Sequence, residues 1–440
     1  MAVHRIDHPS CRAAQSRPLR VVAGIVLTWI VILLPAATGA QSIEQRGFID
    51  GRYFLFPQSA PNDAKRNVFD LLAREEVFLK PNEWFQLAAG LDLRANSHDQ
   101  VENVFDWDDR AIRRPRLALR RLAVTISKGP LTIDAGKVFI RWARADVLNP
   151  TDRFAPRDFM NVLDTDVLPV LAVHPSLHFR NETVEAVWSP KLTPSRLPLF
   201  NQRWTVLPPA VQGIPILDGG SRLPSGSEQG VRWSHAGSGF DASLSFFDGF
   251  NHLPLIETGL LPTGLELTRV FAALRSYGGD VAIPTRWVTL KGEAAYFTSP
   301  TSSNDEYVLY VIELERQVRE WVLVGGYAGE AVTDNRGVFP GEGLQLPGGR
   351  RVFSFAPDRG IAKSFLGRAA YTVDPRRTIA IEAAVRQSGD GLYVKGEYSQ
   401  AFAQHWRLTL TGVGIEGEPG DFLGQFNHNS NVAIALRFSF

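Results

Sequence analysis

The last nine residues decide the fold of this chain: Val432-Ala433-Ile434-Ala435-Leu436-Arg437-Phe438-Ser439-Phe440. Large apolar side chains stand at every second position, and the residues between them are small or polar. Successive side chains of a β-strand point to opposite faces, so the segment predicts a strand with one apolar face and one face of small or polar residues that meets water. The apolar face ends in an aromatic ring at Phe440.

The first forty residues have the pattern of a secretory signal peptide. Four arginines precede an apolar run over 21–35, and small residues follow at 36–40. This order predicts cleavage after Ala40, with Gly39 as the alternative position. An uncleaved inner-membrane anchor is the alternative, although an apolar run of about 15 residues is short for a spanning helix. We therefore expect a signal peptide over 1–40 and one exported domain over 41–440.

Cysteine content and charge exclude several classes of protein. The single cysteine, Cys11, lies in the signal segment, so the exported domain has no disulfide framework. Removing residues 1–40 takes four arginines and one aspartate from the 47 basic and 46 acidic residues, which leaves 43 and 45. This near-neutral balance predicts no nucleic-acid partner.

Alternating segments of about ten residues recur after residue 40, as membrane β-barrels require. No apolar run long enough for a spanning helix occurs there, and a closed barrel is then the one structure that satisfies the backbone in lipid. We expect strands near 46–56, 71–80, 84–96, 114–127, 131–142, 168–180, 182–189, 228–236, 240–250, 266–282, 286–298, 306–317, 320–331, 362–373, 378–388, 390–401, 404–416 and 430–440.

The connections between these strands alternate between short turns and long loops. The gap near 388–390 is short where a long loop is expected. Short turns on one side and long loops on the other are typical of bacterial outer-membrane barrels. The sequence therefore predicts an all-β, transmembrane, antiparallel up-and-down barrel of about 18 strands (16–18) in the outer membrane. A soluble, secreted all-β protein such as a propeller or a double sandwich is the alternative, but no repeat of about 40–45 residues supports a propeller.

Two features resemble the porin-like outer-membrane proteins of Gram-negative bacteria. One is the terminal alternation that ends in Phe440. The other is a Gly-Lys strand over 136–146 that leads into an Asn-Pro-x-Asp loop at 149–153, with Ala143 where a glycine is usual. The resemblance extends to the alginate-export type of eighteen-stranded barrel. It implies an outer-membrane lipid environment, recognition of Phe440 by the barrel-assembly machinery, and passage of solutes.

The stretch from Arg110 to Arg157 contains twelve basic residues and few acidic ones. A charge that faces lipid at mid-membrane costs about 2–4 kcal/mol, so most of these side chains should face the lumen. Arg120 and Arg121 are consecutive and cannot both do so in a regular strand, which predicts a β-bulge at that pair. We expect the channel to be lined by Arg116, Arg120, Lys137, Arg141, Arg144, Asp146, Asp152, Arg153 and Arg157.

Loop 143–167 is expected to fold into the lumen and narrow it. In this hypothesis Asp146, Asp152 and Asp158 pair with Arg144, Arg153 and Arg157 of the same loop, and a basic wall faces an acidic wall. Two simpler interpretations remain open: Asn149–Asp152 is only a turn, and the charges only solvate a water-filled interior. The acidic wall would comprise Glu185, Glu293, Glu313, Glu315, Glu382 and Glu397.

No motif for catalysis or for a cofactor stands out. The histidines are scattered, and the Asn427–Asn431 segment lacks a spaced nucleophile. There is no HExxH motif and no carboxylate loop with calcium spacing. We therefore expect no enzyme activity, metal or cofactor.

The leading functional interpretation is a channel for passive diffusion of small hydrophilic solutes, with anions favoured by the basic wall. The first alternative is an export conduit for an anionic exopolysaccharide. The second is an outer-membrane hydrolase or adhesin barrel. Nothing in the sequence specifies an oligomeric state.

Overall fold

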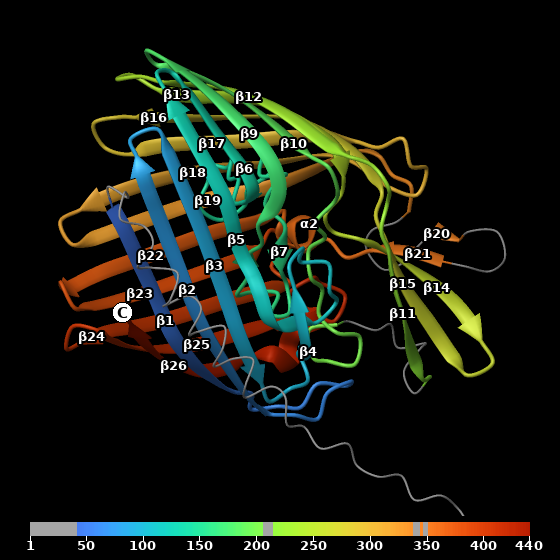
Figure 1. Ribbon diagram of the computed structural model, residues 1–440. Coiled ribbons are helices and arrows are strands. Elements are labelled where there is room, and N and C mark those ends of the chain that lie inside the picture. The colour runs from blue at the N-terminus through green and yellow to red at the C-terminus, as the bar shows by residue number, and fades with distance from the viewer. Residues whose placement is uncertain (1–41, 206–213, 338–343, 346–350) are drawn as a thin grey trace, which may run out of the picture.

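A computed structural model describes residues 42–205, 214–337, 344–345 and 351–440. Within these residues the chain forms a closed barrel of 18 antiparallel strands (Figure 1), which confirms the predicted fold class and strand number. The predicted signal peptide lies outside the described residues. No helix among the described residues is both long enough and apolar enough to cross a membrane.

The wall strands follow one another in chain order, and each is hydrogen-bonded to the next. Every one of them overlaps a strand expected from the alternation. Their bounds are β1 (Ser42–Leu55), β2 (Asn67–Asn82), β3 (Phe85–Asn96), β5 (Arg114–Lys128), β6 (Leu131–Val138), β9 (Val170–Phe179), β10 (Glu182–Ser189), β12 (Glu228–Ala236), β13 (Asp241–Phe250), β16 (Ala273–Pro284), β17 (Thr289–Thr298), β18 (Glu306–Val318), β19 (Trp321–Asp334), β22 (Ser364–Asp374), β23 (Arg377–Arg386), β24 (Gly391–Phe402), β25 (Trp406–Gly417) and β26 (Asn431–Ser439).

Strand β26 closes the barrel against β1, and Phe438 lies opposite Ile49. Phe440 extends this pairing, because its N–H and C=O both bond to the backbone of Gly47, at 3.0 and 2.9 Å. A Cβ atom on Gly47 would lie 2.6 Å from the Phe440 ring, so the glycine leaves room for the terminal aromatic. The closing partnership predicted from the two ends of the sequence is confirmed, and the wall has no free edge.

The outward side of the barrel is apolar. Val432, Ile434 and Leu436 of β26 are 51, 46 and 42 % exposed, as side chains that meet lipid must be. Aromatic rings gather beside the short turns, at the depth where barrels place an aromatic girdle against the lipid headgroups. They include Trp84, Phe179, Phe240, Trp287, Trp321, Phe402, Trp406 and Phe440.

The bulge predicted in β5 is present. Leu119 lies opposite Leu91 and Arg121 opposite Gly90, so Arg120 is an extra residue without a partner on β3. The insertion shifts the phase of the strand by one residue, as the change in its apolar pattern indicated. Arg120 and Arg121 can therefore both face the lumen.

The wall is irregular where β6 ends. The predicted strand over 131–142 stops at Val138, while β5 continues toward the long loops. There β5 pairs with β4 (Val101–Asp106), which runs parallel to it. The sequence did not predict β4, because a loop of 97–113 was expected at this place.

A separate five-stranded sheet projects beyond the long-loop end of the barrel (Figure 1). The predicted strand over 266–282 is wrong in its first part. Its first residues form β15 in this outer sheet, and β16 begins at Ala273. The alternation continues through both parts because Leu265 and Leu267 pack in a core of their own. The outer sheet consists of β11 (Ile216–Arg222), β15 (Gly264–Val270), β14 (Leu255–Leu261), β21 (Arg351–Ser354) and β20 (Leu344–Gln345).

The long loops all lie at one end of the barrel, and the connection 387–390 is short, as predicted. Four small elements belong to connections at this end. They are β7 (Arg157–Asp158), β8 (Asp166–Val167), the helix α2 (Pro357–Ile361) and the 3₁₀-helix η3 (Gly424–Asn429).

Candidate functional site: the barrel lumen

Residues 139–169, here called the inserted segment, leave the wall after β6 and turn inward. Ile140 and Trp142 were expected to continue the strand, but they are 2 % and 1 % exposed. Trp142 packs edge-on against Phe154, and Phe154 packs in the same way on Phe247 of β13, with ring centroids 5.3 and 5.1 Å apart. These contacts bury apolar surface that would otherwise meet water, and they anchor the segment to the wall.

The Asn149–Asp152 sequence forms a turn. The N–H of Asp152 donates to the carbonyl of Asn149 at 3.3 Å. The Asp152 carboxylate accepts the Trp142 N–H at 3.0 Å and lies 2.7 Å from the Arg141 Nε. Asp152 therefore ties the turn to the start of the inserted segment. Because the Asp152 carboxylate pairs with Arg141, it does not pair with Arg153, the next residue.

Two buried carboxylates of the wall hold the segment from the other side. Glu293 on β17 accepts the backbone N–H of Arg144 and that of the following residue, each at 3.0 Å. Glu313 on β18 accepts the N–H of Asp146 at 2.9 Å and that of the following residue at 3.1 Å. Both glutamates were expected to face inward, and hydrogen bonds to a charged acceptor are among the stronger kind.

Ion pairs join the inserted segment to the wall. Arg144 lies 3.0 Å from Asp241 of β13 and 2.5 Å from Asp280 of β16. Asp146 lies 2.7 Å from Lys291 of β17. The hypothesis that the acids and bases of this loop pair with one another is therefore wrong. The inward charges of the wall lie close to the charges of the inserted segment, and a buried charge without a partner is energetically costly.

Asp158 makes a further tie to the basic wall. It is 1 % exposed, and Arg114 of β5 donates to both of its oxygens, at 2.8 and 3.0 Å. Arg196 lies 3.6 Å from the same carboxylate. Burial alone would raise the pKa of Asp158, but the two guanidinium groups outweigh it and hold that pKa well below the usual range.

The arginines of the basic wall are matched by carboxylates. Arg120 lies 3.2 Å from Asp166 of β8. Arg74 of β2 lies at the same distance from Asp166 and donates to Asp92 of β3 at 2.7 and 2.9 Å. The sequence interpretation missed Arg74 and Asp92, although the inward phase of β2 and β3 contained the signal for both. Pairing of this kind reduces the field that a wall arginine presents to a solute.

Lys137 was expected to line the lumen, but it lies within the wall. It is 5 % exposed, and its ammonium group donates to the carbonyls of Trp107, at 2.9 Å, and Leu119. Asp109 lies 2.5 Å from its Nζ. The bulge in β5 and the short β6 leave backbone groups unpaired at this point, and Lys137 satisfies two of them.

Arg116 and Arg141 differ from the other expected lining residues. Arg116 is exposed and forms no ion pair within the described part of the chain. The side chain of Arg141 is 49 % exposed and pairs with Asp152.

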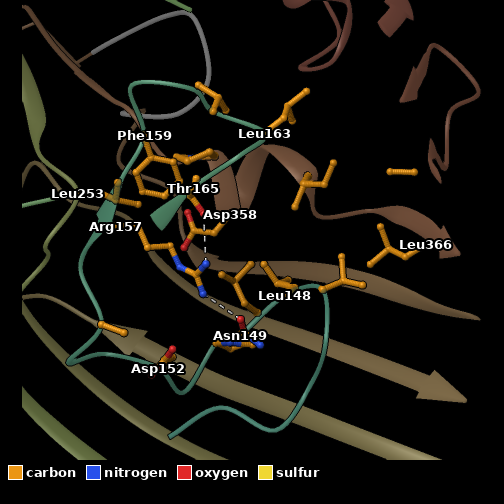
Figure 2. Close-up of a pocket in the computed structure, with 18 of the residues that line it drawn as sticks. Leu148, Asn149, Asp152, Arg157, Phe159, Leu163, Thr165, Leu253, Asp358 and Leu366 are labelled. Carbon is orange, nitrogen blue, oxygen red and sulfur yellow. Dashed lines mark hydrogen bonds between the residues drawn. The ribbon is translucent and has the colours of Figure 1, made fainter. Parts of the chain in front are cut away.

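A cavity of about 360 Å³, here called the large cavity, lies between the inserted segment and the wall. Arg157 points into it and donates to Asn149 at 3.1 Å and Thr165 at 3.3 Å, both neutral acceptors (Figure 2). Arg153 also lines it and lies over the ring of Phe297, 4.9 Å from its centroid. Neither arginine forms an ion pair with any residue that the structure describes. Apolar side chains form much of the remaining lining, among them Leu148, Phe159, Leu163, Leu253 and Leu366.

A second cavity of about 280 Å³, here called the small cavity, lies on the other side of the inserted segment. Its lining follows β1 from Phe48 to Phe56 and is rich in paired charges. Asp50 lies 2.9 Å from Arg52 and 3.0 Å from Arg437 of β26. Six arginines and four aspartates line the small cavity, whereas three arginines and four carboxylates line the large cavity.

No cluster of three or more histidine, cysteine, aspartate and glutamate side chains among the described residues is placed to hold a metal ion.

No protein-family model and no curated protein matches this sequence. Solved structures do match. A BenF-like porin from Pseudomonas fluorescens Pf-5 is 10 % identical, with a TM-score of 0.51 over 91 % of this chain and 99 % of that chain. OccAB4 from Acinetobacter baumannii is 10 % identical, with a TM-score of 0.52 over 91 % and 98 %. The outer membrane protein opdK from Pseudomonas aeruginosa is 7 % identical, with a TM-score of 0.52 over 91 % and 99 %. The chain has the fold of the Gram-negative outer-membrane porins.

Proposed function

We propose that this protein is an outer-membrane channel for passive diffusion of small hydrophilic solutes, with a preference for anions. The porin fold, the apolar outer surface and the charged lumen support a channel. The inserted segment divides the lumen into two cavities of about 360 and 280 Å³, which suits small solutes.

The observation that supports anion preference is the pair Arg153 and Arg157. The wall arginines Arg74, Arg114 and Arg120 are each paired with a carboxylate. Arg153 and Arg157 line the large cavity without such a partner in the described structure, so their charge is available to a passing solute.

The surroundings of Arg157 act on its charge. Burial lowers the pKa of Arg157, and repulsion from Arg141 and Arg153 adds to that effect against the attraction of Asp152. An arginine keeps its proton in spite of such a shift. The lining of this cavity also includes the carboxylates of Asp146, Asp152, Asp358 and Glu382. The support for anion preference is therefore the position of two arginines without an ion pair in the described part of the chain, and not the net charge of the lining.

Reversal potentials in planar bilayers under a potassium chloride gradient test the proposal. Replacement of both arginines (Arg153→Ser with Arg157→Ser) should lower the chloride-to-potassium permeability ratio. The matched variant, Arg120→Ser with Arg141→Ser, should lower it less, because these two arginines are already paired. An unchanged ratio in the first variant would remove the case for anion preference. Absence of any conductance in the wild-type protein would refute the channel itself.

A further inference from the structure

Residues 190–205, here called the strap, follow β10 and lie at the long-loop end of the barrel. Every residue from 192 to 204 except Asn201 is buried. Surface loops normally expose much of their length, so a loop this buried is packed between two other parts of the molecule.

The first end of the strap is fastened to the connection after β4. The ammonium group of Lys191 lies 2.7 Å from Asp108 and 4.3 Å from the centroid of the Trp107 ring. Arg196, which is 5 % exposed, lies 2.7 Å from Asp109. Burial lowers the pKa of Arg196, but its carboxylate neighbours outweigh burial and raise that pKa. This end of the strap is therefore fixed by buried ion pairs.

The other end is fastened by Arg203. Its backbone N–H donates to Asp63 at 3.2 Å, and its Nε lies 3.5 Å from the same carboxylate. Its guanidinium group stacks on Phe56, 3.8 Å from the ring centroid. Asp63 also lies 2.7 Å from the Nε2 of His98. Three external loops therefore meet at the Asp63 carboxylate, and the Arg203–Asp63 contact is here called the latch.

The small cavity ends at this latch. Its lining runs along β1 from Phe48, near the short turns, to Phe56, at the long-loop end. At that end it also includes His98, Arg203 and Trp204. The strap therefore forms the external end of the small cavity.

The outer sheet covers the strap from the other side. Leu197 and Phe200 of the strap share an apolar core with Ile256 of β14 and Leu267 of β15. Arg269 of β15 stacks on Phe200, 4.2 Å from the ring centroid. Strap and outer sheet therefore form one packed unit above the small cavity.

We propose that the strap is a gate: it closes the external end of the small cavity, and release of the latch opens a second route beside the large cavity. This inference rests on the proposed channel function. The contacts around the latch are polar: beside Asp63, Arg203 donates to the carbonyls of Gln58, Lys65 and His428. Such hydrogen bonds can be replaced by hydrogen bonds to water when the strap moves, which suits a gate. Because apolar contacts hold the strap to the outer sheet, the two would move together when the latch is released.

Single-channel recording of Arg203→Met tests the gate. Two routes of comparable size in parallel should give a level with roughly twice the wild-type conductance. The matched control is Arg222→Met in β11, which breaks an exposed ion pair to Glu257 on the outer sheet and should leave the conductance unchanged.

A reversible cross-link gives an independent test. Asp63→Cys with Arg203→Cys, in a Cys11→Ser background, leaves this pair as the only cysteines of the chain. The oxidised form should show the wild-type level, and reduction should produce the higher level. Equal levels in both forms, or an Arg203→Met level equal to that of Arg222→Met, would overturn the gate. These outcomes presuppose wild-type conductance, so they are distinct from failure of the channel proposal.

Discussion

Lys137 and Asp109 form an ion pair inside the barrel wall, with the Nζ and Oδ2 atoms 2.5 Å apart and both side chains almost fully buried. Lys137 belongs to β6, and Asp109 follows β4. The pair therefore fastens β4 to the wall at the place where β6 ends and β5 would otherwise have an open edge.

Loss of the Lys137 ammonium group should affect folding and not selectivity. Lys137→Met leaves Asp109 and two carbonyls with one partner fewer, and breaking a buried pair costs about 3–5 kcal/mol. Urea unfolding in lipid vesicles measures the change. Arg116→Met, at an exposed position without an ion pair in the described structure, should stay within about 0.5 kcal/mol of wild type. A stable Lys137→Met protein with altered ion selectivity would instead place Lys137 in the lumen.

The pinning of the inserted segment by Asp158 should persist over a wide pH range. Its pKa is lower in the folded protein than in the unfolded chain, so the ion pair stabilises the fold above the ordinary carboxyl range. That stabilisation declines only as the pH falls below about 4. Single-channel conductance recorded from pH 8 to pH 5 should therefore show no transition from this group.

Asp158→Asn should remove that stabilisation at every pH in this range. Asp374→Asn is the matched control, because Asp374 pairs with Arg377 at an exposed short turn and its loss should leave stability unchanged. A pH transition near 6 that disappears in Asp158→Asn would show that the pKa of this carboxylate lies above its ordinary range.

Deletion of Arg120 should leave the barrel intact. Arg120 is the extra residue of the bulge, so its removal brings Leu119 and Arg121 into a regular ladder opposite β3. Deletion of Ala123 in the same strand instead moves part of the apolar face into the lumen. Heat-dependent mobility of the folded barrel on gels should show folding of the first variant and not of the second. Equal folding of both would mean that the register of β5 is not set by its apolar face.

Gly136 should resist substitution. Its φ angle is +116°, and a Cβ atom there would lie 2.3 Å from the carbonyl oxygen of Leu122. Gly136→Ala should therefore lower the free energy of unfolding by about 1–3 kcal/mol. Gly396→Ala is the control, because a Cβ atom at Gly396 meets no atom within 4 Å. Equal stability of the two variants in urea titrations would contradict the strain at Gly136.

The barrel was predictable because lipid imposes one rule on every strand. An apolar side chain must stand at each second position, and Val432 to Phe440 show that rule in nine residues. The bulge was predictable for the same reason, since Arg120 and Arg121 cannot both face inward without an extra residue. The periodicity of the sequence contains this information directly.

Apolar alternation could not predict contacts between segments that lie far apart in the sequence. Arg144 pairs with Asp280 and Asp158 with Arg114, and no local pattern names such partners. Alternation also does not tell which sheet a strand joins, so β15 was merged with β16. The burial of Lys137 depends on β4, whose parallel pairing with β5 leaves no signature in either segment.

The latch has a consequence for the order of assembly. Arg203 donates to the carbonyl of His428, at 3.2 Å, and its own carbonyl accepts from Asn429, at 3.0 Å. The latch thus joins the first external loop, through Asp63, to the last one, just before β26. These loops become neighbours only after β26 has paired with β1. The external surface is therefore completed last, and formation of the latch indicates that the barrel has closed.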